Sequence, residues 1–189
     1  MIAILLGPPG VGKGTQAKLA AAANGWKHLS TGELLRDEVA RGTELGQAAD
    51  GYMSRGDLVP DDLMLDMVVA RVNAIDDKDV LLLDGFPRTF EQADALSAKA
   101  PSGSIRLALY FSAPDSVLTS RLLGRGRKDD TKEVITHRLG IYHKTTAPLV
   151  AFYLALGVLS EIDSDRSVEA IQVDTVNLVR THLDGSDPS

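Results

Sequence analysis

The chain has 189 residues, 44% of them hydrophobic and 24% charged, a composition that predicts one compact core and argues against a disordered, collagenous or coiled-coil protein. It contains no cysteine, which excludes disulfides, thiolate zinc sites and cysteine nucleophiles. The net charge of −6 argues against nonspecific binding to nucleic acid, although residues 161–189 alone hold seven acids and two bases.

The apolar segments of the sequence are all shorter than the ~18–20 residues that span a bilayer. The first residues after Met1 run directly into a structured motif, so we expect no secretory leader. These observations predict a soluble, cytoplasmic protein that does not bind membranes or nucleic acid.

Short apolar runs in the sequence predict buried parallel strands, and they occupy residues 2–6, 80–83, 105–111 and, more weakly, 158–162. Helical spacing of apolar residues lies between them, at residues 15–23, 61–75, 90–98, 114–123, 130–156 and 168–183. Strands that alternate with helices predict the α/β class. We expect a doubly wound parallel sheet of about five strands with helices on both faces, of the P-loop NTPase type.

Two features are predicted for the long helix over residues 130–156. The sequence Asp-Thr-Lys-Glu at residues 130–133 is typical of a capping box that opens a helix. Pro148 lies inside the same pattern and is expected to kink the helix, because proline removes one backbone hydrogen bond.

Two segments interrupt the alternation and define the expected domain organisation. Residues 30–59 are predicted to form a polar helical insertion without a strand, and residues 124–130 a short charged loop. The remaining ranges, residues 1–29, 60–123 and 131–183, form the predicted core, and residues 184–189 are expected to be a frayed tail.

The sequence GPPGVGKGT at residues 7–15 follows a predicted strand and opens a predicted helix, as a phosphate-binding P-loop does. Its glycines allow backbone N–H groups to converge on a phosphate, and Lys13 reaches the outer phosphates. The alternative is a strand-to-helix turn that binds nothing, but such a turn gives no reason for the lysine. A strict Walker A motif has Ser or Thr directly after the lysine, whereas this chain has Gly14, followed by Thr15.

A missing hydroxyl at residue 14 leaves Mg²⁺ to be held mostly by phosphate oxygens and water, an arrangement that this ion tolerates. Asp84 ends the second predicted strand, and we expect it to contact the metal through water. The alternative for Asp84 is a cap on the following turn.

A second anion site is predicted where DGFPRT, at residues 84–89, follows a buried strand. Arg88 is placed to clamp a phosphate, unless it pairs with Glu91 or Asp94 on the surface. Thr31 opens the insertion and is a helix N-cap, a ligand contact or both.

A basic loop adds Arg121, Arg125, Arg127 and Lys128, followed by Arg138 in the next helix. It is either a solvated or nucleic-acid-binding face, or a set of cations that stabilises a transferring phosphoryl group and excludes water. The four histidines, His28, His137, His143 and His182, lack metal-ligand spacing and are interpreted as structural or surface residues.

Five segments together, GPPGVGKGTQA, STGELLR, GDLVPD, DGFPRTFEQA and the stretch from GRGRKDD to YHKTTAPL, resemble the adenylate kinase family. Their order and spacing agree over residues 1 to about 170. The resemblance implies reversible phosphoryl transfer from MgATP to AMP, giving two ADP, by a commonly monomeric enzyme. In that family the insertion 30–59 binds AMP, and the loop 124–130 is a lid of the short type, without cysteines for zinc.

The resemblance also implies the site residues. Those implied to bind ATP are Gly10, Val11, Gly12, Lys13, Gly14, Thr15, Arg121, Arg125 and Ser164. Those implied to bind AMP are Thr31, Arg36, Asp57, Leu58, Val59, Gly85, Phe86, Pro87, Arg88, Gln92, Arg127 and Arg138. The implied catalytic set is Lys13, Arg88, Arg121, Arg125, Arg127 and Arg138, and Asp129 and Asp130 match the acids of the lid hinge.

Thr31 and Gln92 bear on which base is bound, because the related UMP/CMP kinases look different at both positions, and this resemblance favours AMP. Gln92 offers one donor and one acceptor, which complement N1 and N6 of adenine. Ser164 stands where the family commonly has glycine near the adenine of ATP. A UMP/CMP-type kinase and a nucleotide-binding switch without turnover remain as alternatives.

Overall fold

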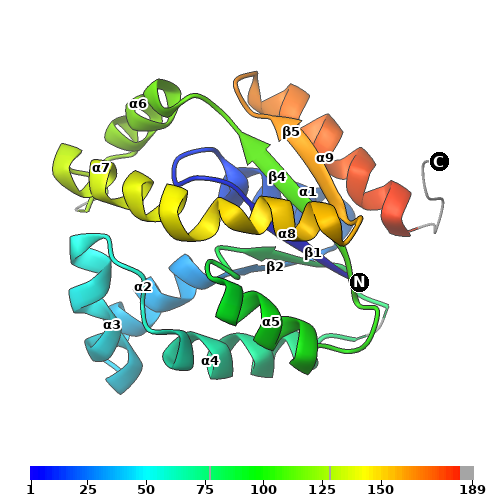
Figure 1. The fold of residues 1–189 in the computed structure, drawn as a ribbon, viewed down its shortest axis with the longest axis horizontal. Coiled ribbons are helices and arrows are strands. Elements are labelled where there is room, and N and C mark those ends of the chain that lie inside the picture. Colours follow the sequence, from blue (N-terminus) through cyan, green and yellow to red (C-terminus); the bar gives the residue numbers. More distant parts are fainter. Residues whose placement is uncertain (77, 128, 184–189) are drawn as a thin grey trace.

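The computed structural model describes residues 1–76, 78–127 and 129–183, and it contains one parallel sheet flanked by helices (Figure 1). The strand order is β2-β3-β1-β4-β5. The strands are β1 (Ile2–Leu6), β2 (Lys27–Ser30), β3 (Leu81–Asp84), β4 (Ile105–Ser112) and β5 (Leu159–Asp163). The α/β prediction is therefore confirmed, and the sheet is doubly wound because β2 and β3 lie on one side of β1 and β4 and β5 on the other.

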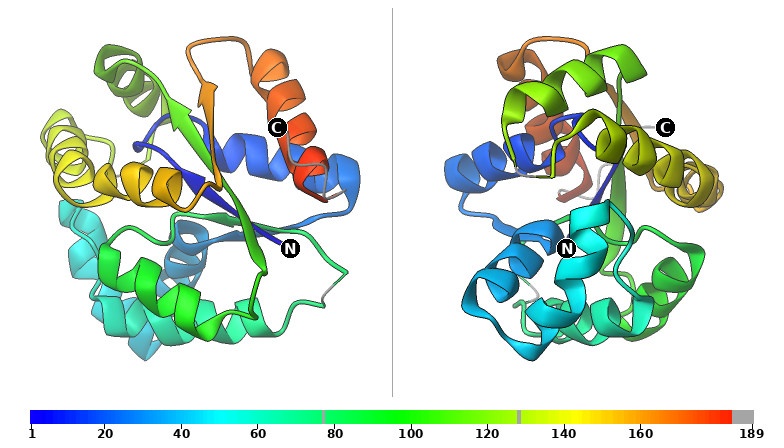
Figure 2. Two further views of the ribbon diagram at one scale, coloured as in Figure 1. Left: turned by 45° about the vertical axis from the view of Figure 1, so that its right-hand side comes forward. Right: turned by 90° about the vertical axis from the view of Figure 1, so that its left-hand side faces the viewer.

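The helices lie on both sides of the sheet in the two views of Figure 2. They are α1 (Lys13–Asn24), α2 (Thr31–Arg41), α3 (Glu44–Arg55), α4 (Asp61–Asn73), α5 (Phe90–Lys99), α6 (Asp115–Arg125), α7 (Lys132–Ile141), α8 (Pro148–Ala155) and α9 (Val168–Leu183). A π-helical turn, η1 (Tyr142–Thr146), joins α7 to α8.

Strand β1 is the centre of the sheet and divides the core into two clusters. Its five residues are all buried, and it pairs with β3 on one side and β4 on the other. Because successive side chains alternate between faces, Ile2, Ile4 and Leu6 join the cluster with α4, α5 and α8. Ala3 and Leu5 join the opposite cluster, with α1, α6, α7 and α9. The phosphate loop follows this central strand, whose side chains pack into a core cluster on each face of the sheet.

Strand β2 was not among the four apolar runs of the sequence. It is an edge strand whose first residue is exposed and whose other three are only partly buried, so it lacks a continuous apolar pattern. It supplies the fifth strand that the predicted architecture requires, and it ends at Ser30, directly before α2.

The long helix predicted over residues 130–156 is interrupted. It consists of α7, the π-helical turn η1 and α8, with Pro148 at the first turn of α8, where a missing N–H is tolerated. The capping box at Asp130 is also wrong, because Thr131 is the N-cap and its Oγ1 accepts from the Val134 N–H at 3.3 Å. Asp130 instead accepts hydrogen bonds from Arg125 and from the Arg127 N–H.

Helices α2 and α3 fall in the segment predicted as an insertion, and they lie below α7 in Figure 1. They pack so closely that a Cβ at Gly46 would overlap the carbonyl of Glu38. Among the described residues no helix is both long and apolar enough to cross a membrane. The predicted tail, residues 184–189, and Lys128 of the predicted lid lie outside the described residues.

Candidate active site

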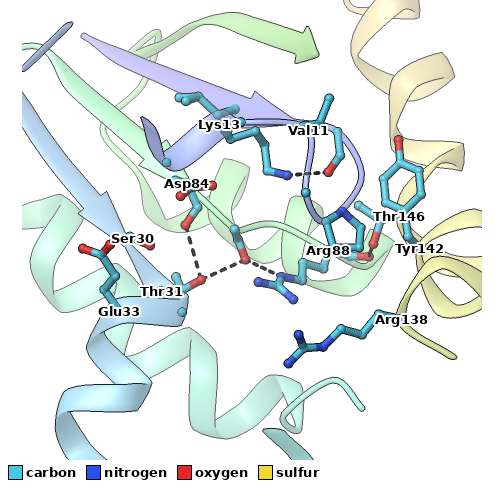
Figure 3. A pocket seen from close by; sticks show the side chains of 18 of the residues that line it. Val11, Lys13, Ser30, Thr31, Glu33, Asp84, Arg88, Arg138, Tyr142 and Thr146 are labelled. Atoms are coloured by element: carbon cyan, nitrogen blue, oxygen red, sulfur yellow. Dashed lines mark hydrogen bonds between the residues drawn. The ribbon is translucent and has the colours of Figure 1, made fainter. Parts of the chain in front are cut away.

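A cavity of about 600 Å³ opens at the carboxyl ends of β1 and β3, where the phosphate loop, α2 and the end of α6 meet. Of the residues predicted to bind or react, it is lined by Gly10, Val11, Gly12, Lys13, Gly14, Thr15, Thr31, Arg36, Asp57, Leu58, Val59, Asp84, Gly85, Pro87, Arg88, Gln92, Arg121, Arg125, Arg127 and Arg138. Figure 3 shows Lys13, Arg88 and Arg138 projecting toward the same space from three elements.

Two predicted residues do not line the cavity. Phe86 is 1% exposed and packs in the core cluster beneath the site. Ser164 is fully buried, and its carbonyl oxygen accepts from Arg121 Nη2 at 2.9 Å. The structure thus places Ser164 behind Arg121, and the roles predicted for both residues stay predictions.

The phosphate loop has the backbone geometry that its glycines predict. Gly7, Gly10 and Gly12 have backbone φ angles of 138°, 87° and 108°, which residues other than glycine rarely adopt. A Cβ at Gly10 would also lie 2.7 Å from Leu122 Cγ, so glycine is required there for packing as well. Gly12 is the N-cap of α1, and the free N–H groups of that helix terminus favour an anion.

Lys13 is held within the loop. Its ammonium donates to the carbonyl oxygens of Gly7 at 2.6 Å and Pro8 at 2.9 Å. Burial of the charge is the main reason why the pKa of Lys13 falls to about 8; the charges of Arg88 and Arg125 lower it further, while Asp84 opposes the shift. The ammonium therefore lacks a strong counter-anion, and a phosphate placed in the loop would supply one.

Asp84 lines the cavity together with Lys13 and Arg88. Burial alone would raise the pKa of Asp84, but contact with His28 and the charges of Lys13 and Arg88 lower it below its usual range, so the carboxylate is ionised. An ideal Cβ at Gly14 would lie 3.2 Å from Asp84 Oδ2. The carboxylate thus occupies the neighbourhood where a Walker A hydroxyl would stand.

The surroundings of Asp84 fit a hydrated Mg²⁺ better than a direct metal site. His28 Nε2 is buried 3.8 Å from Asp84 Oδ2 and finds no hydrogen-bond partner among the described residues. No cluster of three metal-ligating side chains occurs in the described part of the chain. An ionised carboxylate beside an orphaned imidazole suits ordered water, and Mg²⁺ usually keeps several of its waters.

Thr31 is not the N-cap of α2. Ser30 occupies the cap position, while the Thr31 hydroxyl donates to the carbonyl oxygens of Asp84 at 3.3 Å and Gly85 at 2.9 Å. The Gly85 carbonyl also accepts from Arg88 Nε at 2.7 Å. The side chain of Thr31 therefore ties the insertion to the loop that carries Arg88, as the dashed lines in Figure 3 show.

Arg88 projects into the cavity rather than pairing with Glu91 or Asp94. Desolvation by the surrounding protein is the main cause that lowers the pKa of this guanidinium; Asp84 opposes it, and Arg138 adds to it. The backbone of Arg88 is held at both ends, because its N–H donates to Gln92 Oε1 at 2.7 Å and its carbonyl accepts from Thr146 Oγ1 at 2.9 Å.

Arg125 of the predicted lid and Arg138 of α7 are paired with the predicted hinge acids. Asp130 accepts from Arg125 Nε at 2.9 Å and Nη2 at 2.6 Å, and Arg138 forms an ion pair with Asp129. Burial works to raise the pKa of Asp130, but Arg125 outweighs it, and the pKa lies below its usual range. Each acid therefore holds an arginine that lines the cavity.

Several cavity or near-cavity residues were not identified from the sequence. Tyr142 and Thr146 line the cavity from the π-helical turn, a feature that no sequence pattern predicts and that is frequent at functional sites. Asp61 contacts Gln92 from the first turn of α4. Its position at the end of the segment GDLVPD was the one available signal.

Comparison with known proteins gives consistent results. A family model described as adenylate kinase matches residues 5–158. The chain is 47% identical over 170 residues to the adenylate kinase of Synechococcus sp. (strain WH7803), covering 89% of this chain and 92% of that protein. It is 48% identical over 173 residues to that of Parasynechococcus marenigrum (strain WH8102), covering 89% and 92%. For the adenylate kinase of Mycobacteroides abscessus the identity is 46% over 173 residues, covering 90% and 94%.

Proposed function

Since this chain belongs to the adenylate kinase family, whose members transfer phosphoryl groups between adenine nucleotides, we propose that it converts MgATP and AMP reversibly into two ADP by direct in-line transfer. The observation that carries this proposal is the joining of two phosphate-binding halves in one cavity. The loop with Lys13 lines one half and Arg88 lines the other. The two cations are close enough that the charge of Arg88 lowers the pKa of Lys13.

On the donor side, the N–H groups of residues 10–15 and the Lys13 ammonium hold the phosphates of ATP. Arg121 approaches the same loop, because its Nη1 lies 3.5 Å from the Val11 carbonyl oxygen, and it contacts the donor together with Arg125. Ser164 stands behind Arg121 and orders it through its carbonyl oxygen. The loop 124–130 closes over this nucleotide.

On the acceptor side, Arg88 and Arg36 bind the phosphate of AMP, and Gln92 reads the base. Thr31, Gly85, Pro87 and the backbone of residues 57–59 complete the walls of this half, and all line the cavity. The insertion of residues 30–59 closes over AMP. Arg127 and Arg138 lie between the halves and neutralise the group in transfer.

The transfer needs no nucleophile from the protein. An oxygen of the AMP phosphate forms the new bond to the γ-phosphorus of ATP, while the bond from that phosphorus to the β–γ bridging oxygen breaks and leaves ADP. Charge spreads over the three oxygens of the transferring group, and fixed arginines stabilise it. Closure of the site excludes water, which would otherwise accept the phosphoryl group.

Mg²⁺ bound with ATP would add charge neutralisation at the β- and γ-phosphate oxygens. Asp84 fits this ion through intervening water, because it is ionised, buried and adjacent to Gly14. The role of Asp84 is to hold that water and to orient the Lys13 ammonium by its charge.

The test is an assay of ADP formation from ATP with AMP, UMP, CMP and GMP side by side. We expect AMP to be the preferred acceptor by orders of magnitude in kcat/KM. Preference for UMP or CMP would assign the chain to the pyrimidine-specific branch of these kinases. Tight ATP binding with no ADP from any acceptor would indicate a switch without turnover.

A further inference from the structure

The side-chain amide of Gln92 is held by two partners of fixed polarity. Its Nε2 donates to Asp61 Oδ1 at 2.6 Å, and its Oε1 accepts from the Arg88 N–H at 2.7 Å. Gln92 is 2% exposed and lines the cavity, so these contacts are shielded from bulk water. Asp61 itself does not line the cavity, and its second oxygen accepts from Thr89 Oγ1 at 2.8 Å.

These partners fix which end of the amide is oxygen and which is nitrogen. An ionised carboxylate only accepts hydrogen bonds, and a backbone N–H only donates them. Rotating the amide by half a turn would place oxygen against the Asp61 carboxylate and nitrogen against the Arg88 N–H. Both contacts would then be lost at once in a buried site, where unmade hydrogen bonds are costly.

A fixed amide distinguishes two kinds of purine. The remaining N–H and the remaining lone pair of Gln92 are left for a ligand. A 6-aminopurine presents a donor at N6 and an acceptor at N1, whereas a 6-oxopurine presents an acceptor at O6 and a donor at N1. Either edge can pair with an amide, but only with opposite orders of oxygen and nitrogen.

We propose that Asp61 is a positioning residue that sets the base specificity of the acceptor site, by locking the Gln92 amide in the orientation that pairs with a 6-aminopurine. The inference rests on the proposed function and adds the origin of its preference for AMP. Asp61 would also link the contacts to the base and to the phosphate of AMP, because the amide that it holds accepts from the backbone N–H of Arg88. Asp61 therefore acts on the base contact and the phosphate contact together.

The test compares AMP with IMP, which differ at the 6-position and in the proton at N1 and carry no other substituent that could clash. Asp61→Asn replaces an acceptor-only group by an amide that can also donate, so a rotated Gln92 recovers one of its two partners. We expect the ratio of kcat/KM for AMP to that for IMP to fall at least about tenfold. The KM for ATP should not change, because Asp61 lies on the acceptor side only.

Asp62→Asn is the matched control. It removes the same charge from the same first turn of α4, but Asp62 is exposed, and among the described residues its carboxylate accepts only from the neighbouring Leu63 N–H, at 2.9 Å. Its ratio should equal that of the unsubstituted chain. Thr89→Ala is a second control, because it deletes the other partner of Asp61 and the cap of α5. It should lower the melting temperature without changing the ratio.

The outcomes separate the two proposals. An unchanged ratio in folded Asp61→Asn, or equal losses of kcat/KM with AMP and IMP, would contradict the proposed role of Asp61. If Asp61→Asn does not fold, Asp61→Ser, which also both donates and accepts, must show the same fall in the ratio. Failure of the unsubstituted chain to use AMP would overturn the proposed function instead, since the lock concerns only the relative use of two purines.

Discussion

The protonation of Lys13 is expected to respond to a bound nucleotide. Its pKa of about 8 lies below the ordinary 10.5 because the folded chain buries the charge, and between these values the unfolded chain binds more protons. This group therefore makes the fold more stable as pH rises from 8 to 10.5. A bound triphosphate favours the ammonium, so binding of ATP raises the pKa and takes up protons.

We expect ATP binding at pH 8 to take up about half a proton per site at Lys13, and almost none at pH 6.5. Calorimetry in two buffers of different ionisation enthalpy measures this uptake directly. Lys13→Met should abolish the difference between the two pH values. Equal uptake at pH 6.5 and 8 would show that Lys13 is already fully charged in the free protein.

Arg88 is predicted to matter for turnover and not for folding. Its guanidinium faces the cavity, and its one hydrogen bond within the described residues runs to the Gly85 carbonyl. Arg88→Ala should lower kcat at least about a hundredfold, in the range seen when a group stabilising transferred charge is removed. The melting temperature should stay within a few degrees.

Arg106→Ala is the control for Arg88. Arg106 is exposed on β4, and its Nε also points to the carbonyl of a glycine three residues earlier, Gly103, at 3.5 Å. It lies outside the cavity, so its loss should leave turnover normal. Comparable losses in both variants, or normal turnover in Arg88→Ala, would contradict the assigned role.

Site residues were predictable where a short motif combines a charged side chain with glycines in the loop that follows a strand. The loop with Lys13 and the segment with Arg88 were identified because each follows a buried strand and places glycine beside a cation. Asp61 escaped notice because its partners lie 28 and 31 residues along the chain, and only the packing of α4 against α5 brings them together.

At the scale of elements, the contact between α2 and α3 depends on one glycine. A Cβ at Gly46 would overlap the Glu38 carbonyl, and the backbone of α2 would have to move. Gly46→Ala should destabilise the protein by roughly 1–3 kcal/mol, as overpacking of a tight contact does. It should also weaken AMP binding, because α2 carries Thr31 and Arg36.

Gly51→Ala is the matched substitution in the same helix. A Cβ at Gly51 meets only the flexible end of Arg55, at 3.4 Å, so the helix gains the usual advantage of alanine over glycine. We expect stabilisation of about 0.5–1 kcal/mol, measured with Gly46→Ala by urea unfolding. Equal effects at both positions would mean that the two helices do not pack as described.

The elements that sequence patterns missed have physical reasons in common. Strand β2 is a partly exposed edge, and η1 continues the apolar spacing of α7 while shifting the backbone by one residue. The apolar residues of the sequence therefore mark neither the strand β2 nor the change from α-helix to π-helix at η1. The bounds of the buried strands and of the long helix α9 were predicted almost to the residue, because their buried positions are apolar and mark each element in the sequence.

At the scale of the molecule, the insertion touches the core at both ends. Glu33 at the start of α2 pairs with Lys18 of α1 at 2.6 Å, and Asp57 after α3 contacts His137 of α7 at 2.7 Å. Arg138 adds a contact to the Met53 carbonyl oxygen at 3.5 Å. These exposed or partly exposed polar contacts are weak in water, so the position of the insertion is expected to respond to ligands.

We predict that occupying both nucleotide sites brings the insertion and the loop 124–130 toward the core. A compound that joins two adenosines through a chain of phosphates fills both sites without turnover, and it should reduce the radius of gyration in solution X-ray scattering. ATP alone should give a smaller change, because the acceptor half stays open. Identical profiles for the free and doubly occupied protein would contradict closure.

The charge of the whole chain conceals the charge of its site. A net −6 is unexpected for a protein that binds two polyanions, yet five of these six net negative charges come from residues 161–189, which hold seven acids against two bases. Lys13, Arg36, Arg88 and the lid arginines converge instead on one crevice. Total charge describes the surface and is a poor guide to what a cavity binds.

The proximity of Gly14 to Asp84 means that the residue types at these two positions depend on each other. A serine or threonine at residue 14 would press its β-carbon against the Asp84 carboxylate. The hydroxyl-bearing form of the phosphate loop would therefore require the Asp84 carboxylate to move by a few tenths of an ångström. Redesign of the loop has to consider the two positions together, because a β-carbon at residue 14 displaces the carboxylate that we expect to hold the water around Mg²⁺.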